Sequence, residues 1–479
     1  MSMPAGLVAT LIGVKANAPR SSKIRLATRH RTREDKVMID IRSRIQRSSR
    51  RDFLKLAAAA VAAAPFARPV LARAAVKSSA RIVIAGAGAA GLAMANRLSH
   101  MLDGATITLI DGRKAHYYQP GFTLVGAGLK PPSYVEATTG EFVPRNCRWI
   151  EEHVAGFDPA GNVVVTASGE RVPYDFLVLA TGLKLDYEAI EGMSAELIGQ
   201  DGIGSVYAGP QAAADTYAAM SRFADTGGVG LFGRPATEMK CAGAPLKYTF
   251  ITEDTLARRG NRSKARLIYA AHDQTLFGVP IVSEKVRMLY RERGIETVHN
   301  HVMTAIDPGR RIASFKTPDG IQEIGYDFAH VIPPMRAPDA VRASALAWQA
   351  GPLAADGWVE ADKATLRHPR FPNVFVVGDV AGVPKGKTAA SVKWQVPVAV
   401  EHLVGTITDQ PATSTYNGYT SCPLITRIGQ AMLIEFDYDN NLVPSFPGLV
   451  APLEELWVSW VMKETALKPT YYAMVRGLA

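Results

Sequence analysis

The chain has 479 residues, enough for two or three domains, with 54 basic and 44 acidic residues and a formal net charge of +10. The positive charge is concentrated at the N-terminus. Residues 1–74 hold 16 of the basic and 4 of the acidic residues, which leaves 38 basic and 40 acidic residues beyond them. The rest of the chain is close to neutral and has no basic tract of the kind that binds a phosphate backbone, so we expect no nucleic-acid partner.

Residues 48–76 have the features of an export signal. Arg50 and Arg51 precede an alanine-rich apolar run, and Ala-Arg-Ala at 72–74 matches a signal cleavage pattern. The run is too short and too rich in alanine for a stable membrane span. We therefore predict an N-terminal extension and twin-arginine signal over residues 1–74, with Met38 as an alternative start. The exported chain is then expected in the periplasm, peripheral on the outer face of the cytoplasmic membrane.

The mature chain opens with a dinucleotide-binding pattern. An apolar strand at 81–85 leads into three glycines in G-x-G-x-x-G spacing, and a helix follows. A second apolar strand at 105–110 ends in an aspartate that is placed to bind a ribose. The glycines allow a tight turn and a close approach of the backbone to a pyrophosphate at the helix N-terminus. The residues predicted to contact the nucleotide here are Gly86, Gly88, Ala89, Ala90, Gly91 and Asp111.

Two further apolar strands end in residues that are typical of flavoproteins. The strand at 174–179 follows a hairpin-like pair and ends in Ala180-Thr181-Gly182, and the strand at 373–377 ends in Gly378-Asp379. This arrangement resembles FAD-dependent disulfide oxidoreductases, in which the two segments flank the flavin and the aspartate holds the ribityl and phosphate region. The resemblance implies that the nucleotide is FAD and that Ala180, Gly182 and Asp379 bind it.

Residues 228–335 occupy the place of a second nucleotide-binding unit. The strand from Gly228 onward should run into another G-x-G-x-x-G, but residues 234–240 follow instead. The next strand, at 265–270, is followed by Ala271-His272 without a ribose-binding acid at the expected place. We predict that the fold of this unit is retained, that its nicotinamide site is lost, and that the space is given to Cys241.

Three cysteines remain after removal of the signal. Cys147 starts a half-apolar strand and is most simply a packed residue. Cys241 and Cys422 lie beside glycine and proline residues that allow a backbone to come near a flat ligand. On residue context alone, these two cysteines are either a redox pair or a structural disulfide that clamps the C-terminal region.

Several segments together carry a more specific resemblance. In chain order they are 86-GAGAAG-91, 117-YYQPGFTLVGAG-128, 240-KCAGAPLK-247, 277-FGV-279, 333-PPM-335, 378-GD-379, 387-KTAAS-391 and 418-GYTSCPLIT-426. The combination resembles the sulfide:quinone oxidoreductase family, in the branch that includes the mitochondrial enzyme. The resemblance implies that sulfide is oxidised to persulfide or polysulfide sulfur and that electrons pass through FAD to a membrane quinone. The sulfur acceptor stays open.

The resemblance also assigns roles to the cysteines. Cys241 and Cys422 would be the redox pair, with the persulfide on Cys241 and attack on the flavin by Cys422. Lys240 is expected to help keep the thiol deprotonated. A resting disulfide and a resting trisulfide are both left open.

The remaining cofactor residues follow from the same resemblance. Gln119, Val154 and Lys387 join the predicted FAD-binding set, with Lys387 near the pyrimidine end of the flavin, where its charge would stabilise the reduced form. Tyr207 stands near the place where some members of the family have a third cysteine, so FAD is expected to be non-covalent. No metal site is predicted.

The C-terminal region is amphipathic. Leu453, Leu456, Trp457, Trp460 and Val461 have helical spacing and form one apolar face, which Pro469 is expected to end. A stripe of this kind is more often core than membrane surface. The tryptophan and tyrosine content and the family resemblance favour a monotopic anchor beside a quinone channel, with residues 435–438 near the end of the channel.

The predicted fold class is α/β, with two Rossmann-like dinucleotide-binding domains of the disulfide oxidoreductase type and an amphipathic C-terminal membrane-anchoring region. The domain boundaries expected are 75–190 and 336–410 for the FAD-binding domain, 191–335 for the second Rossmann-like domain and 411–479 for the redox-cysteine and membrane region. Three rival functions are the flavin subunit of a flavocytochrome c sulfide dehydrogenase, an NADH:quinone oxidoreductase and a non-catalytic FAD-stabilised assembly factor. A homo-oligomer is left open.

Overall fold

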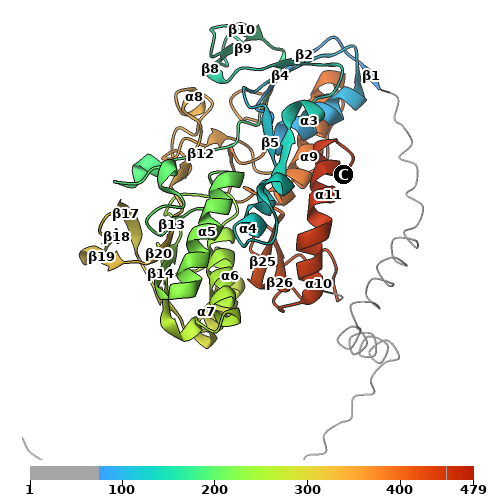
Figure 1. Ribbon diagram of the computed structural model, residues 1–479. Coiled ribbons are helices and arrows are strands. Elements are labelled where there is room, and N and C mark those ends of the chain that lie inside the picture. The colour runs from blue at the N-terminus through green and yellow to red at the C-terminus, as the bar shows by residue number, and fades with distance from the viewer. Residues whose placement is uncertain (1–74, 449) are drawn as a thin grey trace, which may run out of the picture. The chain divides into compact units, whose positions relative to one another are not determined.

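The computed structural model describes residues 75–448 and 450–479, so the export signal predicted within residues 1–74 lies outside the described residues. Two five-stranded parallel sheets organise the described chain (Figure 1). The first sheet has the order β23-β11-β2-β4-β7. Its strands are β2 (Arg81–Ala85), β4 (Thr106–Ile110), β7 (Cys147–Ile150), β11 (Phe176–Leu179) and β23 (Val374–Val376). Because β23 joins from far along the chain, this half is assembled from two separate segments.

The strands of the first sheet are apolar, so helices are needed to cover them. The central strands β2, β4 and β11 read as nearly continuous apolar runs and are buried, as expected for parallel strands covered on both faces. The helix α3 (Ala89–Met101) follows β2 and packs against α9 (Ala389–Thr408). A three-stranded antiparallel sheet, β8 (Val154–Asp158), β9 (Val163–Thr166) and β10 (Arg171–Pro173), precedes β11 and confirms the predicted hairpin.

The second sheet repeats the parallel pattern in the order β13-β20-β14-β15-β16. Its strands are β13 (Ile203–Gly204), β14 (Gly228–Gly233), β15 (Ala265–Ala270), β16 (Ile295–Val298) and β20 (Phe328–His330). The helices of this half are α5 (Pro210–Thr226), α6 (Ala244–Arg258) and α7 (Pro280–Glu292). The fold predicted for the second unit is therefore present.

Smaller elements complete the two halves. An antiparallel meander of β17 (Val302–Asp307), β18 (Ile312–Thr317) and β19 (Gly320–Gly325) lies between β16 and β20 in the chain. The hairpin β25 (Thr420–Arg427) and β26 (Gln430–Phe436) follows α9 and packs on α6. The other short elements are β1 (Val76–Lys77), β3 (Leu102–Asp103), β5 (Ala115–Tyr117), α4 (Phe122–Val125), β6 (Glu136–Thr138), β12 (Lys184–Leu185), β21 (Met335–Arg336), α8 (Asp339–Arg342), β22 (Val359–Glu360) and β24 (Ala381–Gly382).

The C-terminal helical run differs from the prediction at both ends. It starts at α10 (Trp457–Val461) rather than at residue 453, passes through a π-helical turn (Met462–Ala466) and continues as α11 (Leu467–Val475). Pro469 lies inside α11 and does not end the run. The missing proline N–H would point toward residue 465, where the π turn has already changed the hydrogen-bond pattern, so the helix continues.

The apolar stripe of this run faces the protein. Trp460 is buried in the hydrophobic core formed by the second half and the β25–β26 hairpin, and Leu453, Trp457 and Val461 pack against the same core. Farther along, α11 packs against α3 of the first half (Figure 1). Across residues 75–448 and 450–479 we find no helix with the length and apolar character that crossing a bilayer requires.

Candidate functional site

The glycine fingerprint forms a tight turn that only glycine can occupy. Gly86 has a φ of 105°, and a Cβ there would lie 2.4 Å from the carbonyl oxygen of Ala180. A Cβ on Gly91 would lie 1.8 Å from the carbonyl oxygen of Gly86. The end of β11 is therefore packed directly against the turn after β2, which brings the two predicted cofactor segments together.

The same region leaves room for a ligand. At Gly88 the nearest described atom to an added Cβ is 3.9 Å away, and at Gly182, within the described chain, it would meet nothing within 4 Å. Beside these glycines, the buried Thr181 hydroxyl has no hydrogen-bond partner among the described residues. A Cβ on Gly378 would lie 3.0 Å from Ala90 Cβ, so the Gly-Asp segment reaches the first turn of α3. An open glycine cradle with an unpaired hydroxyl fits the phosphates and ribityl chain of FAD.

Asp111 holds this turn in place. Its carboxylate accepts hydrogen bonds from the Ala87 backbone N–H at 2.7 Å and from the Arg113 guanidinium at 2.8 Å. Burial would raise the pKa of Asp111, but the hydrogen bonds and charge of Arg113 hold that pKa below its usual value. The carboxylate is thus ionised and braces the fingerprint loop, while its contact with a ribose stays a prediction.

The two predicted redox cysteines lie side by side. Cys241 follows β14, just before α6, with a left-handed φ of 49°, and its N–H donates to the Lys387 carbonyl at 3.0 Å. Cys422 lies on β25 opposite Ile434 and is buried. A Cβ on Gly243 would lie 2.2 Å from Cys422 Sγ, so glycine is required where β25 meets the start of α6. The two thiols are close enough for each to shift the pKa of the other.

Two buried lysines set the charge of this pair. Lys247 Nζ donates to Cys241 Sγ at 3.4 Å, and Lys463 is buried beside it with its Nζ bonded to the Pro120 carbonyl. The interaction with the Cys422 thiol is the largest cause that lowers the pKa of Cys241 well below its usual value, against the effect of burial, and both lysines lower it further. The same interaction between the thiols, together with burial, raises the pKa of Cys422. Cys241 is therefore the thiolate of the pair.

Lys240, expected to help keep the thiol deprotonated, interacts with Cys241 through its charge but does not contact the sulfur. Lys240 Nζ donates to Gln119 Oε1 at 2.8 Å, and the lysine in contact with the Cys241 sulfur is Lys247. Lys247 stands in the quoted motif, on the first turns of α6, where its return to the sulfur could have been noticed. The role of Lys463 could not be recognised in the sequence, because the π turn that directs its side chain inward was not predicted.

The Gly-Asp segment and Lys387 lie against the segment between β14 and α6 that carries Cys241, called the thiol loop below. Lys387 Nζ donates to the carbonyl oxygens of Asp379 and Ala381 at 2.7 and 3.1 Å and lies 3.5 Å from the centre of the Trp358 ring. Burial lowers the pKa of Lys387 to about 8. Burial raises the pKa of Asp379, while the charges of Lys240 and Lys387 oppose that shift. The lysine therefore braces the turn after β23, and its contact with the flavin stays a prediction.

The other predicted residues have simpler surroundings. Val154 begins β8, pairs with Thr166 and packs on the hydrophobic core around the first sheet, and its contact with the cofactor stays a prediction. Cys147 packs on the same core, and burial raises its pKa to about 11, as expected for an inert packed thiol. Tyr207 donates to the Cys241 carbonyl at 3.1 Å and thus supports the thiol loop.

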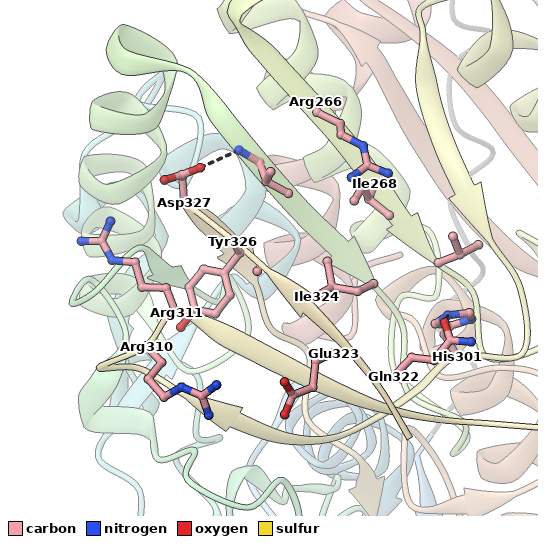
Figure 2. A pocket seen from close by; sticks show the side chains of 13 residues that line it. Arg266, Ile268, His301, Arg310, Arg311, Gln322, Glu323, Ile324, Tyr326 and Asp327 are labelled. Atoms are coloured by element: carbon pink, nitrogen blue, oxygen red, sulfur yellow. Dashed lines mark hydrogen bonds between the residues drawn. The ribbon is translucent and has the colours of Figure 1, made fainter. Parts of the chain in front are cut away.

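A pocket of about 640 Å³ opens in the second half of the molecule (Figure 2). It is bordered by the start of β14, by β15 and by the meander, and Figure 2 shows the Asp327 carboxylate bonded to the backbone after Gly228. The Arg266 guanidinium at its wall is paired with Glu296 at 2.7 Å. Its lining includes neither cysteine of the pair and no predicted cofactor residue, so it is separate from the thiol site.

Comparison with known proteins agrees with this geometry. Residues 80–400 match the pyridine nucleotide-disulphide oxidoreductase family. The mitochondrial sulfide:quinone oxidoreductase of Mus musculus is 34% identical over 405 residues, which cover 84% of this chain and 87% of that protein. The Dictyostelium discoideum counterpart is 34% identical over 372 residues, covering 78% and 80%. The chain belongs to the sulfide:quinone oxidoreductase family.

The fold of the family is also the fold of this chain. The crystal structure of the sulfide:quinone oxidoreductase from Aquifex aeolicus superposes with a TM-score of 0.68 at 21% identity, covering 83% of this chain and 92% of that one. The two parallel sheets described above are thus those of a pyridine nucleotide-disulphide oxidoreductase.

Proposed function

We propose that this protein oxidises sulfide at the Cys241–Cys422 pair and passes the electrons through FAD to a quinone. The observation that carries the proposal is the thiol pair itself, in which Lys247 Nζ lies 3.4 Å from Cys241 Sγ. Family membership supports the substrate and the acceptor, because the relatives are named sulfide:quinone oxidoreductases. FAD, when bound, supplies the two-electron acceptor between the thiols and the quinone.

The unequal thiols favour a direction for the reaction. When hydrosulfide attacks the oxidised pair, the bond between the two sulfurs breaks, and the cysteine with the lower pKa leaves more readily as a thiolate. Cys241 has that lower pKa. The attack then falls on Cys422, which gains the sulfur as a persulfide, and Cys241 keeps the bonding electron pair beside Lys247. This reverses the roles expected from the sequence, where the persulfide was assigned to Cys241.

The decisive test uses the mature FAD-loaded protein with sulfide and a short-chain quinone. Cys241→Ser and Cys422→Ser should each lower quinone reduction by roughly 10³-fold or more, because neither can form the disulfide that sulfide attacks. Cys147→Ser is the matched control and should retain full activity. Unchanged quinone reduction in Cys241→Ser would refute the mechanism, and flavin bleaching without quinone reduction would favour a cytochrome-linked enzyme.

A separate experiment shows which cysteine the hydrosulfide attacks. The oxidised wild-type protein is mixed briefly with sulfide, trapped with an alkylating reagent and digested for mass spectrometry. We expect the additional sulfur on the peptide that contains Cys422. Recovery of that sulfur on the Cys241 peptide would restore the assignment made from the sequence.

We also propose that the mature protein binds the membrane surface through an aromatic patch. Trp394 is 51% exposed and Phe446 is 41% exposed, and the Tyr419 ring lies 5.2 Å from Trp394. The Tyr419 hydroxyl lies 3.3 Å from Ser445 Oγ, next to Phe446 in the chain. Exposed aromatic side chains favour the interfacial region of a bilayer. The double variant Trp394→Ser, Phe446→Ser should lose vesicle binding, while Ile321→Ser, at a 64% exposed position, should not.

The localisation proposed is the periplasmic face of the cytoplasmic membrane. It is supported by Arg50 and Arg51 before the alanine-rich run. Replacing both arginines by lysine should leave the full-length protein in the cytoplasmic fraction of its host. Continued export of that variant at the wild-type level would rule out twin-arginine transport.

A further inference from the structure

Three polar side chains of the second half each have a buried atom without a hydrogen-bond partner among the described residues. The atoms are Arg234 Nε, the Tyr269 hydroxyl and His272 Nδ1. Native proteins leave few buried polar atoms unpaired, and such atoms usually contact an ordered water, an ion or a ligand. None of the three residues belongs to the thiol pair or to the predicted cofactor set.

The strand register brings these residues to one edge of the second sheet. β14 and β15 are paired in parallel up to their last residues, Gly233 and Ala270. Arg234 therefore leaves the sheet next to the segment that carries His272, and Tyr269 is the penultimate residue of β15 and fully buried. The charge of Arg234 acts on both Tyr269 and His272. The carboxyl edge of a parallel sheet is where α/β proteins commonly hold ligands.

In this cluster the Asp273 carboxylate has hydrogen-bond partners, whereas the Arg234 guanidinium has none among the described residues. Asp273, the acid beside it, accepts from the Thr275 N–H at 2.8 Å and from the Thr275 hydroxyl at 3.0 Å, and its carboxylate lies 3.3 Å from His272 Nε2. Within the described chain, Arg234 takes part in no hydrogen bond or ion pair, so its planar fork of donors is free. Such a fork matches two oxygens of a phosphate or a sulfur oxyanion.

We propose that Arg234, Tyr269 and His272 bind an oxyanion of phosphate or sulfite size at the carboxyl edge of the second sheet. Arg234 supplies two donors and the charge, and the Tyr269 hydroxyl supplies a third donor. His272 faces Asp273 through Nε2, so its Nδ1 accepts a hydrogen bond from a protonated oxygen of the anion. The anion is either free in solution or the phosphate of a larger nucleotide. Arg234 is the first residue after β14, where this unit lacks the glycine fingerprint.

The test is calorimetric titration of the FAD-loaded mature protein, at constant ionic strength, with inorganic phosphate, sulfite and NADP⁺. The wild type should bind at least one probe saturably. Arg234→Gln should weaken that binding at least tenfold, and Tyr269→Phe should weaken it several-fold. The matched control is Arg266→Gln, on β15 as Tyr269 is, because the Arg266 guanidinium is already paired with Glu296.

The titrations distinguish a site for a free anion, a site for a nucleotide phosphate and no anion site. Phosphate or sulfite binding that is lost in Arg234→Gln and not exceeded by NADP⁺ assigns the site to a free anion. Tighter NADP⁺ binding, lost in the same variant, assigns it to a nucleotide phosphate. If none of the three probes binds, or if Arg266→Gln weakens binding equally, the proposal is overturned and water alone satisfies the three atoms.

Two further variants control for misfolding of Arg234→Gln and for a dependence on the thiol pair. If Arg234→Gln does not fold, Arg234→Lys keeps the charge but loses the fork, and it should weaken binding by an intermediate factor. Cys241→Ser should bind the anion as the wild type does. The result therefore does not depend on whether the thiol chemistry proposed above is correct.

Discussion

At the scale of single residues, the reactivity of Cys241 depends on a buried lysine. Lys247 is 3% exposed and donates to the sulfur at 3.4 Å. Lysines are rarely buried unless they are paired, so its position is explained by the thiolate that it contacts. The cation and the thiolate stabilise each other.

Replacing that lysine should shift the pH profile of the enzyme. Lys247→Gln removes a charge that lowers the pKa of Cys241, so the pKa rises. Wherever the pKa exceeds the pH, the thiolate fraction falls by about tenfold for each further unit of the rise. We expect the rate of Cys241 alkylation to reach its plateau at higher pH. The exposed Lys316→Gln is the control, and identical profiles for the two variants would contradict the proposed role of Lys247.

At the scale of elements, the C-terminal helical run belongs to the thiol site as well as to the surface. Its π turn places Lys463 inside the protein, 2% exposed, where burial lowers the pKa of its ammonium to about 7. Turns of this kind are often found at functional sites. The run therefore contributes a charge to the thiol pair in addition to any role at the membrane.

Lys463→Met tests this second role. It should slow the reaction of sulfide with a short-chain quinone in detergent by several-fold while vesicle binding stays unchanged. Because Lys463 is charged mainly below pH 7, the difference from the wild type should be largest at pH 6 and shrink toward pH 8. Lys468→Met, whose ammonium bonds the Tyr134 carbonyl, is the control on the same helix. Equal rates for Lys463→Met and the wild type would show that the run contributes no charge to the thiol pair.

The glycine fingerprint and the C-terminal run show where prediction from the sequence works and where it fails. The glycine fingerprint was predicted in detail, because strand, turn and helix follow one another within residues 81–98. The C-terminal run was placed too early and ended too soon, since helical spacing alone does not reveal a π turn ahead of Pro469. The closeness of Cys241 and Cys422, which are far apart in the chain, followed only from the family resemblance.

At the scale of the whole molecule, both halves contain a buried neutral histidine. Burial lowers the pKa of His116 in the first half to about 4 and that of His330 in the second half to about 3. Between pH 6.5 and these values the unfolded chain binds protons that the folded chain does not. The free energy of unfolding should therefore fall as the pH is lowered from 6.5, by up to about 1.4 kcal/mol per histidine per pH unit.

Urea unfolding at pH 7 and pH 5 measures this dependence. His330→Gln should be less stable than the wild type at pH 7, because it loses the stacking of His330 on Tyr248, but its midpoint should fall less between the two pH values. Equal falls in the two proteins would show that other groups govern the acid response.

The left-handed backbone at Cys241 has a consequence for stability. A side chain at a φ of 49° costs on the order of 1 kcal/mol, which glycine would not incur. Cys241→Gly should therefore unfold at a temperature no lower than Cys241→Ser does, although both lack the sulfur, and differential scanning calorimetry can compare them. If so, the fold alone would favour glycine at this position, and the cysteine is kept at the expense of stability for the chemistry that it performs.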